Sequence, residues 1–176
     1  MGTIFVDNLE PQSGTSLTLG ASGDTIGLAT GATAGFGKIG QVIQGSRTTT
    51  FETTSTSFAD AGLSASITPD STSSKILIMC STSAIHTATT SAGGETLIRF
   101  YNGTTAIGDE YQVAKSRQDG SYTQEVGGGG TAMFLYSPST TSAVTINVYT
   151  RITSGSNGRI CQNNHGATIT LMEVLA

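Results

Sequence analysis

The chain has 176 residues, a formal net charge of −4 and only 11% charged residues, and it is rich in Gly, Thr and Ser. This length is sufficient for one domain with a buried core, and the low charge argues against an intrinsically disordered chain. No run of Lys and Arg indicates nucleic-acid binding, and no apolar run reaches the roughly 18 residues of a membrane-spanning helix.

Residues 1–40 differ from the rest of the chain. They carry short apolar groups between Gly-rich stretches: residues 4–6, Leu17 with Leu19, and Ile26 with Leu28. Groups this short cannot form a core by themselves, so we predict an extended arm that packs against a body or against copies of itself. The arm has no basic segment followed by an apolar one, so we predict no secretory signal and expect assembly in a cytoplasm.

The stretch "LSASITPDSTSSKILIMC", residues 63–80, predicts two strands joined by a turn. Residues 63–68 alternate strictly between apolar and polar side chains, which is typical of a strand with one buried face. Pro69 and Asp70 then mark a turn. Residues 75–80 are apolar on both faces, which indicates a central strand that is covered from both sides.

A core of only two sheets cannot cover both faces of residues 75–80. Leu77 and Met79 lie on the face opposite the two isoleucines of this segment. The C-terminal stretch "TLMEVLA" is also apolar on both faces, and Met172 belongs to it. We therefore predict that Leu77, Met79 and Met172 lie in an interface between subunits.

The remaining segments complete an all-β pattern. Asn102-Gly103, between two strand-like runs, is a strong hairpin signal because both residues tolerate positive φ. Residues 131–152 indicate a strand, a Ser-Pro-Ser turn and a second strand, and the chain ends in a last strand. Strands at this spacing predict an antiparallel, jelly-roll-like β-sandwich over residues 41–176.

Two long polar loops are predicted between these strands, at residues 108–130 and 154–166. In the first loop, four side chains are predicted to form a recognition surface: Tyr111, Lys115, Arg117 and Tyr122. Aromatic and Arg side chains dominate recognition surfaces, although these four could instead pack at a subunit interface. The four glycines at residues 127–130 predict a mobile loop or a bulge.

No motif predicts catalysis, a cofactor or a metal site. Residues 35–40 match the G-x-G-x-x-G pattern of dinucleotide-binding turns, but a strand-like segment follows where that motif needs a helix, so a hinge is predicted. Cys161 and His165 lie four residues apart, and two ligands do not close a metal site. Asp109 and Glu110 are adjacent at the start of the first loop, and because adjacent residues in extended backbone point to opposite sides, they are not predicted to act as a carboxylate pair.

The chain has two cysteines, Cys80 and Cys161. A disulfide framework would need more cysteines in a chain of this size. Assembly in a cytoplasm favours two reduced cysteines that are buried like small apolar residues. One disulfide between them is the alternative.

Four stretches of the chain resemble one known family. They are "MGTIFVDNLEPQSGTSLTLGASGDTI", "TTSTSFADAGLSASITPDSTSSKILIM", "YSPSTTSAVTINVYTRI" and "ATITLMEVLA". They look like parts of the short tail-fibre-like structural proteins of bacteriophages, especially marine and cyanobacterial phages, and the similarity covers most of the chain. The resemblance implies an N-terminal segment that docks on the virion or intertwines with copies, a displayed β-sandwich, and threefold association.

We therefore predict a non-enzymatic bacteriophage virion protein, a trimeric short tail fibre or fibre tip that is assembled in the host cytoplasm. Its arm, residues 1–40, is expected to bind other virion proteins of the tail or baseplate. Its sandwich is expected to contact a glycan or a protein of the host surface. The alternative is a capsid decoration (cement) protein that stabilises the phage head, whereas a depolymerase and a free lectin are disfavoured. No cofactor, nucleic acid or membrane insertion is expected.

Overall fold

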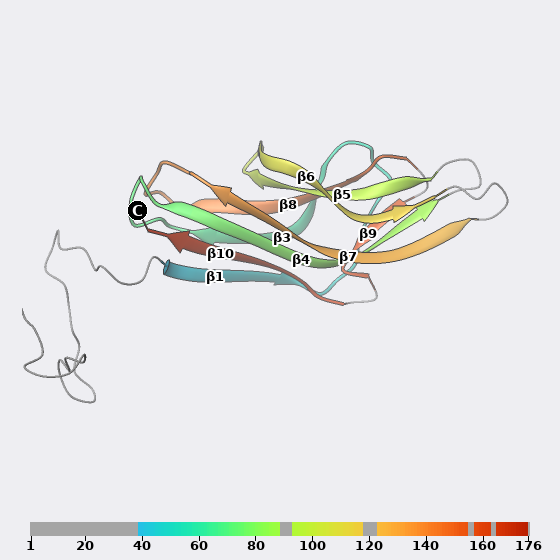
Figure 1. The fold of residues 1–176 in the computed structure, drawn as a ribbon, viewed down its shortest axis with the longest axis horizontal. Coiled ribbons are helices and arrows are strands. Elements are labelled where there is room, and N and C mark those ends of the chain that lie inside the picture. Colours follow the sequence, from blue (N-terminus) through green and yellow to red (C-terminus); the bar gives the residue numbers. More distant parts are fainter. Residues whose placement is uncertain (1–38, 89–92, 118–122, 155–156, 163–164, 176) are drawn as a thin grey trace, which may run out of the picture. The chain divides into compact units, whose positions relative to one another are not determined.

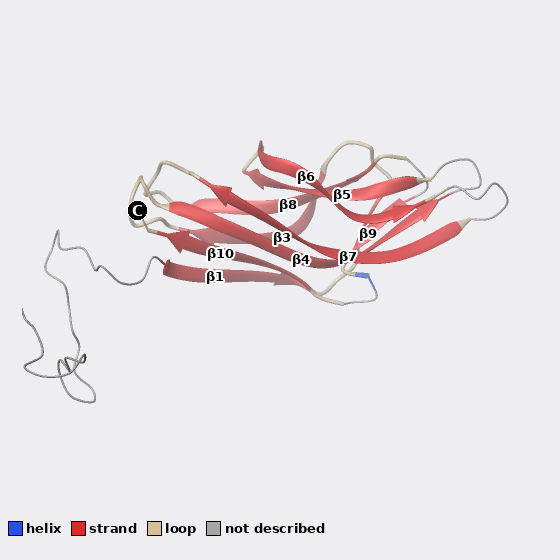
Figure 2. Cartoon of the chain, viewed as in Figure 1, coloured by secondary structure: helices blue, strands red, loops and turns tan. Residues whose placement is uncertain are grey.

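The structure, a computed structural model, describes residues 39–88, 93–117, 123–154, 157–162 and 165–175 (Figure 1). Strands make up most of these residues, and apart from a 3-10 turn at Gln162 they contain no helix (Figure 2). No helix in these ranges is long and apolar enough to cross a membrane. The predicted all-β fold class is confirmed. The predicted arm, residues 1–40, lies outside the described ranges except for Ile39 and Gly40, so its role stays a prediction.

The strands form two antiparallel sheets that pack face to face as a sandwich (Figure 1). Sheet A contains β1 (Ile39–Arg47), β2 (Phe51–Thr53), β4 (Lys75–Ala88), β7 (Gln124–Tyr136), β9 (Asn157–Ile160) and β10 (Ala167–Val174). Sheet B contains β3 (Ala59–Ile67), β5 (Gly94–Asn102), β6 (Thr105–Ser116) and β8 (Val144–Ile152), in the order β3-β8-β5-β6.

β4 lies at the centre of sheet A. On one side, β7 pairs with it from Ile76 to Ala88. On the other side, β10 pairs with the first half of β4 and β9 pairs with the second half. β1 pairs with the outer edge of β10, and β2 pairs with the outer edge of β9. The predicted central position of the strand that begins at Lys75 is therefore confirmed.

Alternation of side chains decides which residues enter the core between the sheets. In β3, Leu63, Ala65 and Ile67 are buried, while the serines between them are exposed, as strict alternation predicts. In β4, Ile76 and Ile78 are fully buried against sheet B. Their packing partners come from the inward faces of β3, β5 and β8.

The hairpin predicted at Asn102-Gly103 joins β5 to β6. Asn102 pairs with Thr105, and Gly103 has a φ of 59°. A Cβ atom on Gly103 would meet nothing within 4 Å. The left-handed backbone, and not a lack of space, therefore favours glycine at this turn.

The prediction of two long polar loops is wrong. Residues 108–130 include most of β6 and the first half of β7, and residues 154–166 include β9. The four glycines at residues 127–130 pair in regular register with β4, so they form neither a loop nor a bulge. Glycine and polar residues are typical of turns, but they also suit an edge strand that packs closely on a neighbour. A Cβ atom on Gly128 would lie only 2.7 Å from the backbone oxygen of Val113 in β6.

The two sheets also come close together at the other edge of the sandwich, where β1 meets β3. A Cβ atom on Gly45 would overlap the backbone oxygen of Ser64. Nearby, the Gln41 side-chain amide donates a hydrogen bond of 2.7 Å to the backbone oxygen of Thr68. Both edges of the sandwich therefore depend on a glycine that lets two backbones approach.

Glu173 of β10 is a buried carboxylate that ties three segments together. It accepts hydrogen bonds of 2.7 Å from the side-chain amide of Gln41 in β1 and from the backbone N–H of Asp70, in the turn before β4. Burial raises the pKa of this carboxyl, whereas the polar groups of Gln41, Ser74 and Asp70 lower it, and the net pKa lies below the ordinary 4.5. The group therefore remains a carboxylate at neutral pH.

Cys80 and Cys161 are both buried and free, which is the first of the two alternatives considered from the sequence. Burial raises the pKa of the Cys80 thiol to about 12 and also raises the pKa of Cys161. Because the thiolate is the reactive form of cysteine, neither side chain is suited to nucleophilic chemistry at neutral pH.

His86 of β4 is completely buried. Its Nδ1 atom lies 3.1 Å from the Oγ1 atom of Thr96, and the Thr96 hydroxyl also lies within hydrogen-bonding distance of the backbone oxygen of Ile85. Which of the two atoms, Nδ1 or Oγ1, donates to the other depends on the tautomer of the imidazole. Burial lowers the pKa of His86 from its ordinary 6.5, against smaller opposite effects of the Ser154 backbone and the Glu95 carboxylate.

We predict that His86 makes the domain less stable as the pH falls from about 7.5 to about 5, because the unfolded chain then binds a proton that the folded chain binds only at lower pH. Urea unfolding of the natural chain and of His86→Leu, at both pH values, measures the effect. The variant should lose most of this pH dependence, and His165→Leu should keep it. Equal pH dependence in the natural chain and His86→Leu would contradict the assignment.

We further predict that Gly45→Ala destabilises the domain by about 1–3 kcal/mol or more, because the added methyl group has no room beside the Ser64 backbone. Gly127→Ala is the matched control in the same sheet, since a Cβ atom there meets nothing within 4 Å. It should change the free energy of unfolding little. Urea unfolding followed by circular dichroism compares the two, and equal effects would refute the packing argument.

Candidate interaction surface

The outer face of sheet A, turned away from sheet B, carries rows of apolar side chains. Successive residues of a strand point to opposite faces, so the strand register places outward side chains of neighbouring strands side by side. The first row is Val42, Met172, Leu77 and Leu135, the second is Gln44, Thr170, Met79 and Met133, and Ile39 with Val174 forms a shorter third row. These rows run across β1, β10, β4 and β7.

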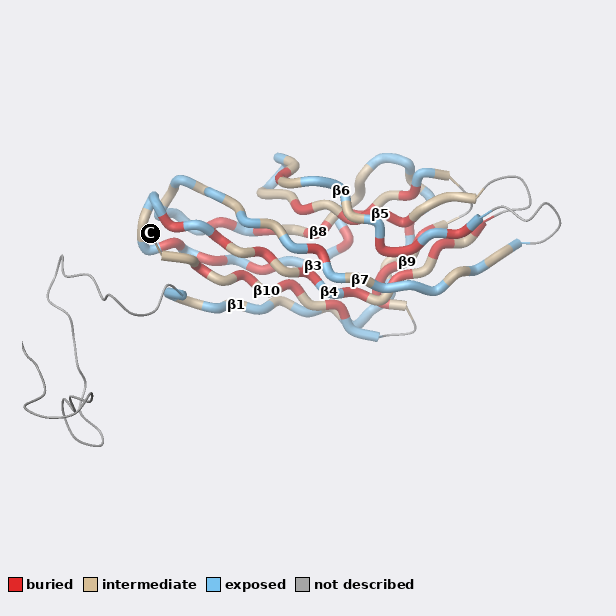
Figure 3. The backbone as a smooth tube through the Cα atoms, viewed as in Figure 1, coloured by how far each residue is buried: buried red, intermediate tan, exposed pale blue. Residues whose placement is uncertain are grey.

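Eight of these residues form what we call the apolar patch: Ile39, Val42, Leu77, Met79, Met133, Leu135, Met172 and Val174. Its members on the edge strands β1 and β7 are strongly exposed, with exposed fractions of 49% for Ile39, 53% for Val42, 58% for Met133 and 47% for Leu135. Within the described ranges, no other large apolar side chain reaches this level of exposure. The exposed stretches of β1 and β7 are visible in Figure 3.

The methionines of the chain gather in the apolar patch. Of the four methionines, Met1 lies outside the described residues and the other three belong to the patch. Methionine is enriched at the centres of protein interfaces, because its flexible and polarisable side chain fits irregular surfaces. Three of them on one sheet face indicate a surface adapted to contact another molecule.

The structure brings together the three residues for which the sequence predicts a subunit interface. Met172 of β10 pairs in register with Leu77 of β4, and Met79 lies one row further along β4. Their role in an interface stays a prediction. Sequence reasoning missed the patch residues of β1 and β7, although "TAMFLY" shows the same two-sided apolar pattern as "KILIMC".

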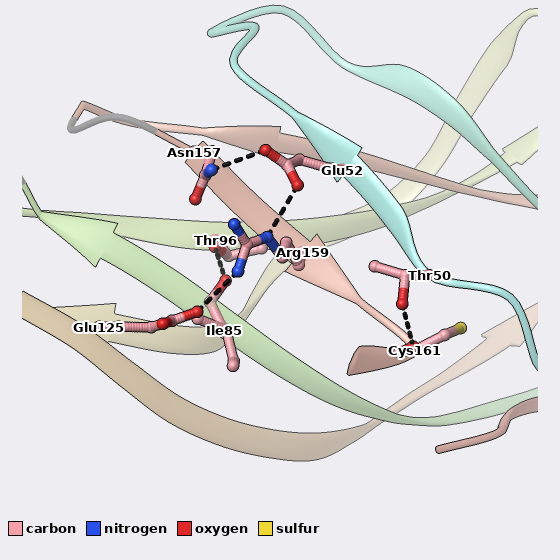
Figure 4. A network of polar contacts seen from close by, with 8 residues as sticks. All are labelled: Thr50, Glu52, Ile85, Thr96, Glu125, Asn157, Arg159 and Cys161. Atoms are coloured by element: carbon pink, nitrogen blue, oxygen red, sulfur yellow. Dashed lines mark hydrogen bonds and ion pairs between the residues drawn. The ribbon is translucent and has the colours of Figure 1, made fainter. Parts of the chain in front are cut away.

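The other half of the same outer face is polar, and its charges pair with one another (Figure 4). Arg159 of β9 lies between two carboxylates, 2.8 Å from Glu52 of β2 and 2.7 Å from Glu125 of β7. Asn157 donates a further hydrogen bond of 2.7 Å to Glu52. Exposed ion pairs of this kind add little to stability, but they leave this half polar. A row of small hydroxyl side chains separates the halves: Ser46, Thr168, Ser81 and Thr131.

The residues predicted to form a recognition surface do not lie together on one exposed loop. Tyr111 and Lys115 belong to strand β6, Arg117 follows it, and Tyr122 lies outside the described residues. Lys115 forms an ion pair of 2.6 Å with Glu95. No finding tests a role of these residues in recognition, which stays a prediction.

Tyr111 is half-buried and ties β6 to β7. Its hydroxyl donates a hydrogen bond of 2.8 Å to the backbone oxygen of Met133, and its ring packs on Phe100 with 5.8 Å between the ring centres. Burial, together with the nearby Asp109 carboxylate, raises the pKa of Tyr111. The contacts of this side chain therefore give it a structural role at the edge of the sandwich where β6 meets β7.

The outer face of sheet B carries an aromatic cluster that the sequence analysis did not identify. Tyr101 and Tyr149 stack with 4.0 Å between ring centres, Phe58 packs on Tyr101, and the guanidinium of Arg151 lies over Phe58. Arg151 also forms an ion pair of 2.6 Å with Glu110. Aromatic pairs between neighbouring strands stabilise sheets, so the cluster explains how this face holds together. In the part of the chain that the structure describes, no three His, Cys, Asp or Glu side chains form a possible metal site.

No protein family and no curated protein matches the chain. Similar solved structures include those of infectious bursal disease virus Gx strain, of the VP2 subviral particle of that virus, and of its T13 viral particle. Each is 12% identical over 87% of this chain, with TM-scores of 0.38, 0.35 and 0.35. The chain spans only 42%, 42% and 40% of those chains. At this identity and TM-score, the likeness assigns neither a family nor a function.

We predict that Tyr111→Phe lowers the free energy of unfolding by about 0.5–1.5 kcal/mol, because it removes the hydrogen bond between β6 and β7. Arg117→Gln, at an exposed position just beyond β6, should have no measurable effect on stability. Urea unfolding of both variants provides the comparison. A Tyr111→Phe variant as stable as the natural chain would remove the structural role and leave this side chain free for recognition.

Proposed function

We propose that this chain is a non-enzymatic structural protein of a bacteriophage virion. The apolar patch carries the proposal, because a contiguous group of exposed apolar side chains rimmed by polar residues is often a functional contact surface. The charged groups on the same face pair with one another, as in Glu52, Arg159 and Glu125, and do not converge on a ligand site. The resemblance of four sequence stretches to tail-fibre-like proteins is the reason for proposing a bacteriophage virion as the assembly.

Within that class, the chain is a short tail fibre or fibre tip that forms a trimer. The arm predicted at residues 1–40, up to the start of β1 at Ile39, attaches it to other virion proteins of the tail or baseplate. The outer face of sheet A is covered in the assembly, which leaves the outer face of sheet B and the loop ends to contact the host surface. The buried and protonated thiols of Cys80 and Cys161 support a structural role, because neither is poised for chemistry.

We predict that purified particles of the virus that encodes this chain contain it on the tail. Gold-labelled antibody against the full chain, viewed by electron microscopy, gives the location, and antibody absorbed with free protein is the control. Label on the head would instead identify a capsid decoration protein. Particles that lack the chain by both labelling and mass spectrometry would contradict a virion role.

A further inference from the structure

We infer that further copies of this chain cover the apolar patch, so that sheet A of each copy faces sheet A of its neighbours around a common axis. The inference deepens the proposed function by naming the partner at this surface. Its strongest support is the register of the strands, which extends an apolar row without interruption from Val42 through Met172 and Leu77 to Leu135. This row crosses the sheet from one edge strand to the other.

The electrostatics of the patch favour a copy of the same surface as its partner. None of its eight side chains is charged, and Lys75, which pairs with Val174, is the one charged residue in its rows. Two such faces can therefore meet without bringing like charges together, which is the usual penalty for self-association of a charged surface.

The size of the patch also fits the centre of an interface between copies. Four strands about 4.8 Å apart and three rows about 6.8 Å apart enclose roughly 400 Å², an area that the patch shares with Gln44, Thr170 and Lys75. A stable interface buries about 800 Å² on each partner, with an apolar centre and a polar rim. The row of Ser and Thr side chains beside the patch supplies such a rim, since it is neutral and can form hydrogen bonds: Ser46, Thr168, Ser81 and Thr131.

The methionines make the patch suitable for packing against an identical surface. Sheet faces that pack on each other leave gaps where side chains of different length meet. Met79, Met133 and Met172 have flexible side chains that fill such gaps. Met133 is 58% exposed in the single chain, so the covering copy would bury a large part of its surface.

The test is the association state of the full chain and of variants at exposed patch positions. Leu135→Glu places a charge at the outer end of the apolar row, on a side chain exposed enough for the fold to tolerate it. Gln112→Glu is the matched control, because it adds the same charge at an exposed position of sheet B. Sedimentation from nanomolar to micromolar concentration compares them, and circular dichroism verifies that both variants fold.

The natural chain and Gln112→Glu should associate, with three copies expected if the resemblance to tail fibres holds. Leu135→Glu should weaken association by roughly thirtyfold or more, as expected for the loss of an interface anchor. Met133→Lys is a second variant with the same expected result. A monomeric natural chain, or association that Leu135→Glu and Met133→Lys leave unchanged, would overturn the inference.

Oxidation by hydrogen peroxide distinguishes further copies from a cover within the same chain. In the associated natural chain, Met79, Met133 and Met172 should oxidise slowly, and in Leu135→Glu they should oxidise quickly. Slow oxidation in a monomeric natural chain would mean that another part of the same chain covers the patch, which contradicts the inference. A monomer that is nevertheless present in particles would leave the proposed virion role standing and would contradict the proposed trimer. A chain that associates but is absent from particles would support the inference and contradict the proposed function.

Discussion

β4 has apolar side chains on both faces, so it fills the core with one set and presents the other set on the outer face of its sheet, and this constraint organises the domain. β4 sends Ile76 and Ile78 into the core and presents Leu77 and Met79 on the opposite face. Sheet B covers the first pair. The strands that flank β4 extend the second pair into the apolar patch, because their register aligns apolar outward residues with those of β4. The core and the patch are thus two sides of one strand.

The edges of the sandwich follow a second constraint, which is the need to bring two sheets together without exposing long unpaired strand edges. At both edges a glycine allows the two backbones to approach closely, Gly45 beside Ser64 and Gly128 beside Val113. Side chains then fix the contact, through Gln41 at one edge and Tyr111 at the other. A chain with 23 glycines uses some of them for such close approach and others only for a left-handed turn, as at Gly103.

The sequence predicted the structure correctly where a pattern is typical of one kind of element, and wrongly where the same pattern is typical of two. Strict alternation in residues 63–68 and two-sided apolarity in residues 75–80 predicted the buried face of β3 and the central place of β4. The glycines at residues 127–130 predicted a loop, because their composition cannot distinguish a turn from a closely packed edge strand. The aromatic cluster could not be predicted, since Phe58, Tyr101 and Tyr149 meet only through strand pairing.

The candidate interface shows the same limit. Leu77, Met79 and Met172 could be proposed from local pattern alone, because each lies in a short segment that is apolar on both faces. Adding Val42 and Met133 requires knowledge that β1 lies next to β10 and that β7 lies next to β4. Register between distant segments is set by the packing of the whole domain, which no single segment encodes.

On one side of β4, sheet A is made of two separate strand pairs: β1 with β10 beside the first half of β4, and β2 with β9 beside the second half. The chain leaves β1 at Arg47 and returns in β2 at Phe51, and it breaks again between Ile160 of β9 and Ala167 of β10. β2 and β9 are only three and four residues long, so their hydrogen-bond ladders are short. Their amide hydrogens should exchange with solvent through local opening that leaves the long pairing of β4 with β7 and β10 closed. Amide hydrogens at the end that carries the apolar patch should therefore exchange more slowly than those of β2 and β9 at the opposite end.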